Sequence, residues 1–195
     1  MRAGHRTGAG TALSVALFVL CVAAPGAAAA PRGSADSVAG SAKNMLLEVS
    51  PYPADLRLAA HGFDAELPGV TGLFAATDVQ GYAVGSGELP GAGEFRVQGE
   101  VTCVKVVGNR ATIKYRFART RGPGAPPAGW GVQVFVEDNG PPGAGTPDGN
   151  ATDAPLPPEI FDPTADQCEL PRGPYNPVDS GNYVVRDGDA VGAGL

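Results

Sequence analysis

The density of glycine and proline is the feature that most restricts the fold of this chain. The 195 residues include 29 glycines and 19 prolines, and these occur in almost every part of the sequence. Long helices and coiled coils are excluded, because either residue type breaks a helix when it recurs within a few turns. The chain is nevertheless 43% hydrophobic and only 17% charged, which is too apolar for a disordered protein. This combination predicts short β-strands joined by tight turns.

One β-hairpin is predicted directly by the residue pattern. Residues 111–117 (ATIKYRF) alternate between apolar and polar side chains, as in a strand with one buried face and one face in solvent. Residues 100–107 (EVTCVKVV) form a second strand, and their apolar positions change phase near Cys103, which indicates a β-bulge or burial of both faces. Gly108 and Asn109, between the two segments, suit a two-residue hairpin turn.

Other segments have strand patterns of the same kind. They are residues 130–137 (WGVQVFVE), 94–98 (EFRVQ) and 182–186 (NYVVR), with a weaker pattern at 79–84. No segment shows the apolar periodicity of a helix. Five or six short strands separated by Gly/Pro-rich loops predict an all-β fold, either a small antiparallel β-sandwich or a barrel.

The first 30 residues have the pattern of a secretory signal peptide. Basic residues precede an apolar run over residues 11–24, and small residues follow at 26–30. The run is shorter than the roughly 20 apolar residues that a membrane-spanning helix needs. We therefore expect a secreted, extracellular protein with a signal peptide at 1–30. A flexible or partly packed segment at 31–66 and a single all-β domain at 67–190 are expected to follow.

The charge of the chain bears on its partners. The net charge is −6 at pH 7, and removal of residues 1–30 takes away Arg2 and Arg6, which leaves 12 basic against 20 acidic residues. A protein of this sign is repelled by phosphate backbones and by anionic lipid surfaces. We therefore expect no nucleic-acid partner and no membrane span, and no motif implies a cofactor. The pattern identifies neither the extracellular ligand nor an oligomeric state.

Cys103 and Cys168 are the two cysteines that remain after the predicted signal peptide. In an exported protein such a pair is predicted to form a disulfide. Closure of the long loop between them would stabilise the fold by roughly 4 kcal/mol. A reactive thiol or a pair of metal ligands is the alternative. No CxxC spacing supports a metal, and His61 is the one histidine beyond residue 30.

Four segments in the second half of the chain resemble a known group of proteins. They are GEVTCVKVVGNRATI (Gly99–Ile113), VFVEDNGPPG (Val134–Gly143), DQC (Asp166–Cys168) and GNYVVRDG (Gly181–Gly188). In this order they resemble a group of uncharacterised small secreted bacterial all-β domains, and the resemblance covers roughly half of the chain. It implies an extracellular all-β domain, and it implies no particular activity.

An acidic, glycine-rich loop follows the strand expected at 130–137. Asp138, Asn139 and Asp148 carry oxygen atoms of the kind that calcium binds, which makes them a weak candidate for a calcium site. Their spacing differs from that of the EF-hand calcium loop. Asp, Asn and Gly after a strand also form turns through local hydrogen bonds, and this alternative accounts for all three residues. Apart from this candidate, no metal site is predicted.

The sequence offers little support for catalysis. His61 is the one histidine available as a base, it lies outside the strand-rich part, and the chain has no G-x-S-x-G motif. No catalytic residue is therefore predicted. Tyr115 and Trp130 are in phase with the apolar faces of their strands, so we expect them in the core rather than on a sugar-binding platform. We expect a non-catalytic extracellular binding or structural module. The alternative is a secreted hydrolase that uses paired carboxylates, with or without structural calcium.

Overall fold

The computed structural model describes residues 34–45 and 53–188, and the signal peptide predicted at 1–30 lies outside these ranges. Within them, no helix is long and apolar enough to span a membrane. The described elements are β1 (Asp36–Met45), β2 (Pro53–Glu66), β3 (Leu73–Leu89), β4 (Gly93–Val107), β5 (Arg110–Arg121), β6 (Gly131–Glu137), β7 (Gly149–Thr152), α1 (Pro158–Phe161), the 3-10 turn η1 (Asp162–Thr164), β8 (Gln167–Glu169), β9 (Asn176–Pro177) and β10 (Ser180–Arg186).

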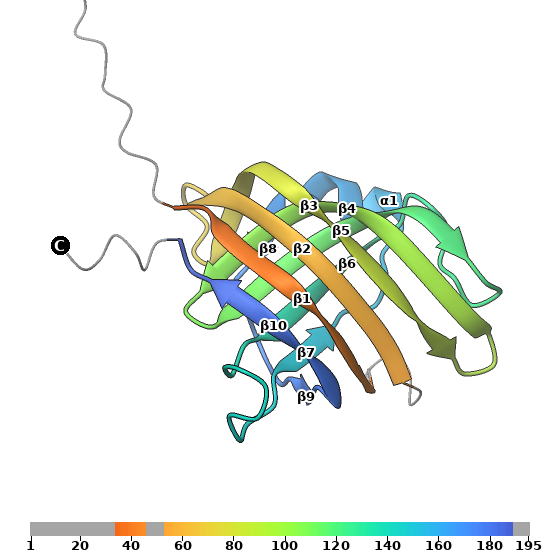
Figure 1. The fold of residues 1–195 in the computed structure, drawn as a ribbon. Coiled ribbons are helices and arrows are strands. Elements are labelled where there is room, and N and C mark those ends of the chain that lie inside the picture. Colours follow the sequence, from red (N-terminus) through yellow and green to blue (C-terminus); the bar gives the residue numbers. More distant parts are fainter. Residues whose placement is uncertain (1–33, 46–52, 189–195) are drawn as a thin grey trace, which may run out of the picture. The chain divides into compact units, whose positions relative to one another are not determined.

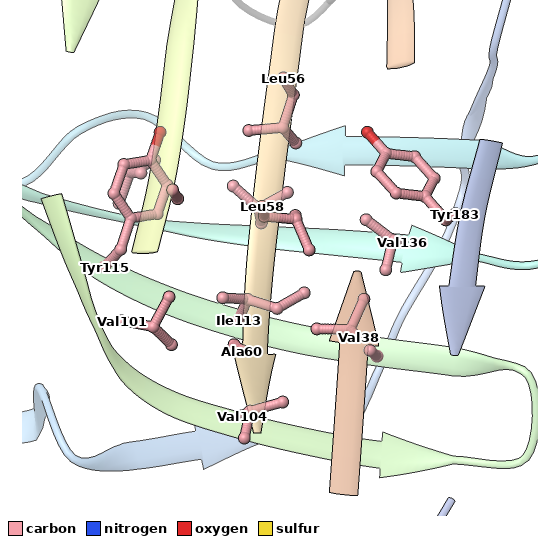
Figure 2. Packing of buried hydrophobic residues seen from close by; sticks show 14 of the residues in the cluster. Val38, Leu56, Leu58, Ala60, Val101, Val104, Ile113, Tyr115, Val136 and Tyr183 are labelled. Carbon is pink, nitrogen blue, oxygen red and sulfur yellow. The ribbon is translucent and has the colours of Figure 1, made fainter. Parts of the chain in front are cut away.

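The strands form one antiparallel sheet that curls into a half-barrel (Figure 1). The strand order is β10-β1-β2-β3-β4-β5-β6-β7-β9, and β8 pairs with β3. The predicted all-β, antiparallel fold is confirmed. Long, strongly twisted strands such as the 17-residue β3 allow a single sheet to curl around its own apolar face. Figure 2 shows part of the resulting core, to which β2 contributes Leu56, Leu58 and Ala60, and β5 contributes Ile113 and Tyr115.

The hairpin predicted at Gly108–Asn109 is confirmed. Val107 of β4 lies opposite Arg110 of β5, and Gly108 has a φ of +61°, a backbone conformation that favours glycine. The register of the same pair of strands shifts between Val101 and Cys103. This shift is the β-bulge indicated by the change of phase in the sequence.

Residues before 67 belong to the sheet. β1 pairs with β2 over its full length and with β10 on its other edge, and β2 pairs with β3. In β2 the buried side chains of Ala54, Leu56, Leu58 and Ala60 alternate with residues of the opposite face. The sheet therefore begins well before residue 67, where the sequence placed the start of the all-β domain. The segments expected at 94–98 and 100–107 likewise form one strand, β4.

The predicted disulfide between Cys103 and Cys168 is confirmed, with 5.8 Å between the Cα atoms. It joins β4 to β8, at the end of the segment that contains α1. This segment packs against the side of β5 that was expected to face solvent, and that expectation is wrong. Thr112 and Lys114 on this side are buried, and Lys114 Nζ donates a hydrogen bond to the carbonyl oxygen of Thr164 at 3.0 Å. Lys114 is accommodated there because the covering segment supplies a hydrogen-bond acceptor, whereas the buried hydroxyl of Thr112 has no hydrogen-bond partner among the described residues.

Candidate functional site

The candidate site is an apolar pocket on the inner side of the curled sheet, with a volume of about 80 Å³. Strands β2 to β6 contribute most of its wall, and the segments around Pro126 and Pro155 complete it. Its apolar lining includes Leu56, Phe95, Val97, Phe117 and Val132. Such a concave, apolar space with few polar groups is the usual form of a small-molecule site.

One strand of the pocket wall carries almost no side chain, and residues of the neighbouring strands approach it closely. Gly85 of β3 lines the pocket, and a Cβ atom built on it would lie 3.3 Å from both Tyr115 Oη and Val97 Cγ2. Ala54 of β2 lines the same space. Glycine within a strand loses packing and backbone entropy, and it often marks a place where another group approaches closely. Gly85 therefore allows the hydroxyl of Tyr115 and the side chain of Val97 to lie close to β3 at the pocket wall.

Tyr115 supplies a polar group inside this apolar space. Its hydroxyl forms no hydrogen bond with another residue in the described part of the chain, although buried tyrosine hydroxyls usually have a partner. Burial raises the pKa of Tyr115, and the charge of Tyr183 adds to this rise. The hydroxyl therefore keeps its proton at neutral pH and can donate one hydrogen bond into the pocket.

Paired carboxylates, which the hydrolase alternative requires, do not converge in the pocket. Asp55 is the one carboxylate among the described residues that line it. The acidic residues that do converge, Asp36 and Asp64, are buried around Lys105. Lys105 Nζ lies 3.1 Å from Asp64 and 4.0 Å from Asp36.

These two carboxylates serve the fold. Asp36 accepts hydrogen bonds from the N–H groups of Val106 at 2.6 Å and Gly188 at 2.9 Å, which ties β1 to β4 and to the residues that follow β10. Burial raises the pKa of Asp36 to about 6, in spite of the opposing effect of these N–H groups and of Lys105. With side chains only 3–7% exposed, Asp36, Asp64 and Lys105 offer no space for a substrate.

The calcium candidates are brought together, and each is engaged by the protein itself. Asp148, 5% exposed, accepts hydrogen bonds from the N–H groups of Asn139 at 2.8 Å and Tyr183 at 2.6 Å. Asp138 accepts from the N–H of Val185 at 2.9 Å. These contacts fix β10 against the loop after β6. Within the described ranges, no group of three or more His, Cys, Asp or Glu residues has an arrangement suited to a metal ion. A calcium ion here stays a prediction from the sequence alone.

Of the remaining candidates, His61 and Trp130 do not line the pocket, whereas Tyr115 does. His61 is exposed on β2 opposite Gln80. Trp130 packs against the core, and Tyr115 belongs to it, as the phase of their strands predicted. The pocket itself was missed by the sequence reasoning. The alternation of small residues at Gly81, Ala83, Gly85 and Gly87 in β3 was the one signal that could have indicated it.

Comparison of the chain with known protein families, with curated proteins and with solved structures finds no match. What the protein does is therefore inferred from its own geometry.

Proposed function

We propose that this chain is an exported, non-catalytic binding module whose inner pocket holds the apolar end of a small ligand. The observation that carries the proposal is the apolar pocket lined by Gly85 and by Tyr115, whose hydroxyl has no hydrogen-bond partner among the described residues. The predicted signal peptide and the disulfide between Cys103 and Cys168 agree with an extracellular location, because disulfides persist in oxidising compartments.

The pocket indicates the chemical class of the ligand. Its size suits a short alkyl chain rather than a bulky ring system. Each methylene group that moves from water to its apolar wall increases the affinity. Burial of one methylene contributes about 0.8 kcal/mol, which corresponds to roughly a fourfold gain in affinity. The hydroxyl of Tyr115 adds one hydrogen bond to an oxygen atom of the ligand. The expected ligand is a slender apolar chain that carries a hydrogen-bond acceptor.

A chain-length series of probes tests this proposal. Primary alcohols from 1-butanol to 1-octanol are titrated into the protein, and methyl NMR signals of Leu56, Val97 and Val132 report occupation of the pocket. We expect affinity to rise roughly fourfold per added methylene and then to level off once the pocket is full. Signals of Val104 and Val136, which belong to the core but do not line the pocket, should stay in place.

Two valine-to-alanine variants distinguish binding in the pocket from a general loosening of the core. Val97→Ala enlarges the pocket and is expected to move the plateau to longer alcohols. Val136→Ala removes the same atoms from a buried core position outside the pocket, so it should lower stability and leave the plateau unchanged. The proposal is refuted if the affinity of the alcohols does not depend on chain length, or if Val136→Ala shifts the plateau as much as Val97→Ala.

A further inference from the structure

A second β-bulge changes the face of the sheet on which the side chains at the end of β5 lie. The register between β4 and β5 shifts between Gln98 and Gly99, whose partners are Arg119 and Phe117. Ala118 is therefore the extra residue. Phe117 is buried in the core, whereas Arg119, two positions further, is exposed. In a regular strand both would lie on the same face, so the bulge turns Arg119 outwards, as bulges next to functional sites often do.

The result is a cluster of three arginines on the outer face of the sheet. Arg96 lies directly opposite Arg121, and Gln98 lies directly opposite Arg119. The four exposed side chains line a groove of about 240 Å³, which we call the arginine groove. Neighbouring positions on one face of a sheet are about 5 Å apart across strands and about 7 Å apart along a strand. Two guanidinium groups at such spacing can hold one tetrahedral anion between them.

The described residues do not balance the charges in this groove by ion pairs. No ion pair joins Arg96, Arg119 or Arg121 to a carboxylate within residues 34–45 and 53–188. β4 also carries two exposed acids on this face. Glu94 lies two residues before Arg96, and Glu100 lies two residues after Gln98. Like charges placed directly opposite in a sheet are destabilising, and the chain as a whole is acidic. An external anion would relieve this repulsion.

We infer that the arginine groove binds a tetrahedral oxyanion, the phosphate or sulfate group of a ligand. The planar guanidinium groups match the oxygen atoms of such an anion in pairs, and Gln98 supplies a neutral N–H donor. The groove is independent of the inner pocket, because Arg96 and Gln98 flank Val97 in β4 and therefore point to the opposite face of the sheet.

The test follows the side-chain Nε–Hε signals of arginine by NMR while sodium phosphate or sodium sulfate is added at constant ionic strength, with chloride as the balancing salt. The signals of Arg96, Arg119 and Arg121 are expected to shift with saturation, and that of Arg186, an exposed residue of β10, is expected to stay in place. Arg121→Gln should weaken binding about tenfold or more, since it removes a charge-assisted contact. Arg186→Gln makes the same change in net charge and should leave the affinity unaltered.

Saturable shifts with phosphate alone assign the groove to phosphate groups, and equal shifts with sulfate extend it to tetrahedral oxyanions in general. The inference is overturned if neither anion gives saturation. It is equally overturned if Arg186 shifts as much as the groove residues, or if Arg186→Gln weakens binding as much as Arg121→Gln, because screening of the whole surface would then explain the effect.

Discussion

The hydrogen bonds of Asp148 make a quantitative prediction about stability. Its buried carboxylate accepts the N–H groups of Asn139 and Tyr183, and Tyr183 is itself fully buried in β10. A hydrogen bond to a charged acceptor contributes about 1.5–3 kcal/mol. Asp148→Ala leaves both N–H groups unpaired, so we expect a loss of about 3–5 kcal/mol. That is a large part of the 5–15 kcal/mol typical of a domain.

Urea unfolding followed by circular dichroism at pH 7 measures this loss. Asp148→Asn keeps one acceptor oxygen, so its free energy of unfolding should fall by about half as much. This variant still tests the prediction if the alanine variant does not fold. The control is Asp179→Ala, which removes the same charge from an exposed position near the start of β10 and should change stability by less than about 0.5 kcal/mol. A loss below about 1 kcal/mol for Asp148→Ala would refute the role of its carboxylate as the anchor of β10.

Three other changes have defined outcomes. Replacement of Cys103 and Cys168 by alanine should lower the free energy of unfolding by roughly 4 kcal/mol in the same urea assay, and an unchanged value would contradict the contribution assigned to the disulfide. The raised pKa of Asp36 means that the folded protein holds this proton up to about pH 6, whereas the unfolded chain releases it near pH 4. The free energy of unfolding should therefore fall as the pH rises from 4 to 6, by up to about 3 kcal/mol. The slope of unfolding free energy against pH should be flatter in Asp36→Asn, and equal slopes would exclude Asp36 as the source. Tyr115→Phe should lower the affinity for every alcohol by the same factor of about five to ten, which corresponds to the loss of one hydrogen bond. The gain per methylene should persist, and an unchanged affinity for all alcohols would show that the hydroxyl does not reach the ligand.

Much of the fold was predictable where strands alternate large apolar and polar side chains. The pattern of residues 111–117, the turn at Gly108–Asn109 and the change of phase near Cys103 are local signals, and the strand, the turn and the bulge they indicate are confirmed. The solvent-exposed face expected for residues 111–117 was wrong, because the segment that covers it is distant in sequence. The disulfide was predictable from the number of cysteines and the expected compartment. These features depend on residues close in sequence or on a simple count.

The features that were missed depend on small residues and on contacts across the sheet. β1 and much of β3 are rich in glycine and alanine, which carry little apolar signal, and the prolines around β2 suggested an interrupted segment. The pocket lies between residues of several strands and two loops, and a sequence pattern does not show where such neighbours leave space between them. The exposed pair of Arg96 and Arg121 depends on the bulge at Ala118, which appears only when the two strands are aligned.

The most direct test of the proposed binding function is the affinity of Gly85→Val for 1-hexanol, measured by the same methyl NMR titration. A Cβ atom at this position lies 3.3 Å from Tyr115 Oη and Val97 Cγ2, so a valine side chain presses on these two wall residues and its methyl groups reduce the volume of the pocket. We predict that the variant folds, with the signals of Val104 and Val136 in their native positions, and binds 1-hexanol at least about tenfold more weakly. A folded variant with native affinity would contradict the account, because the alcohol would then bind elsewhere.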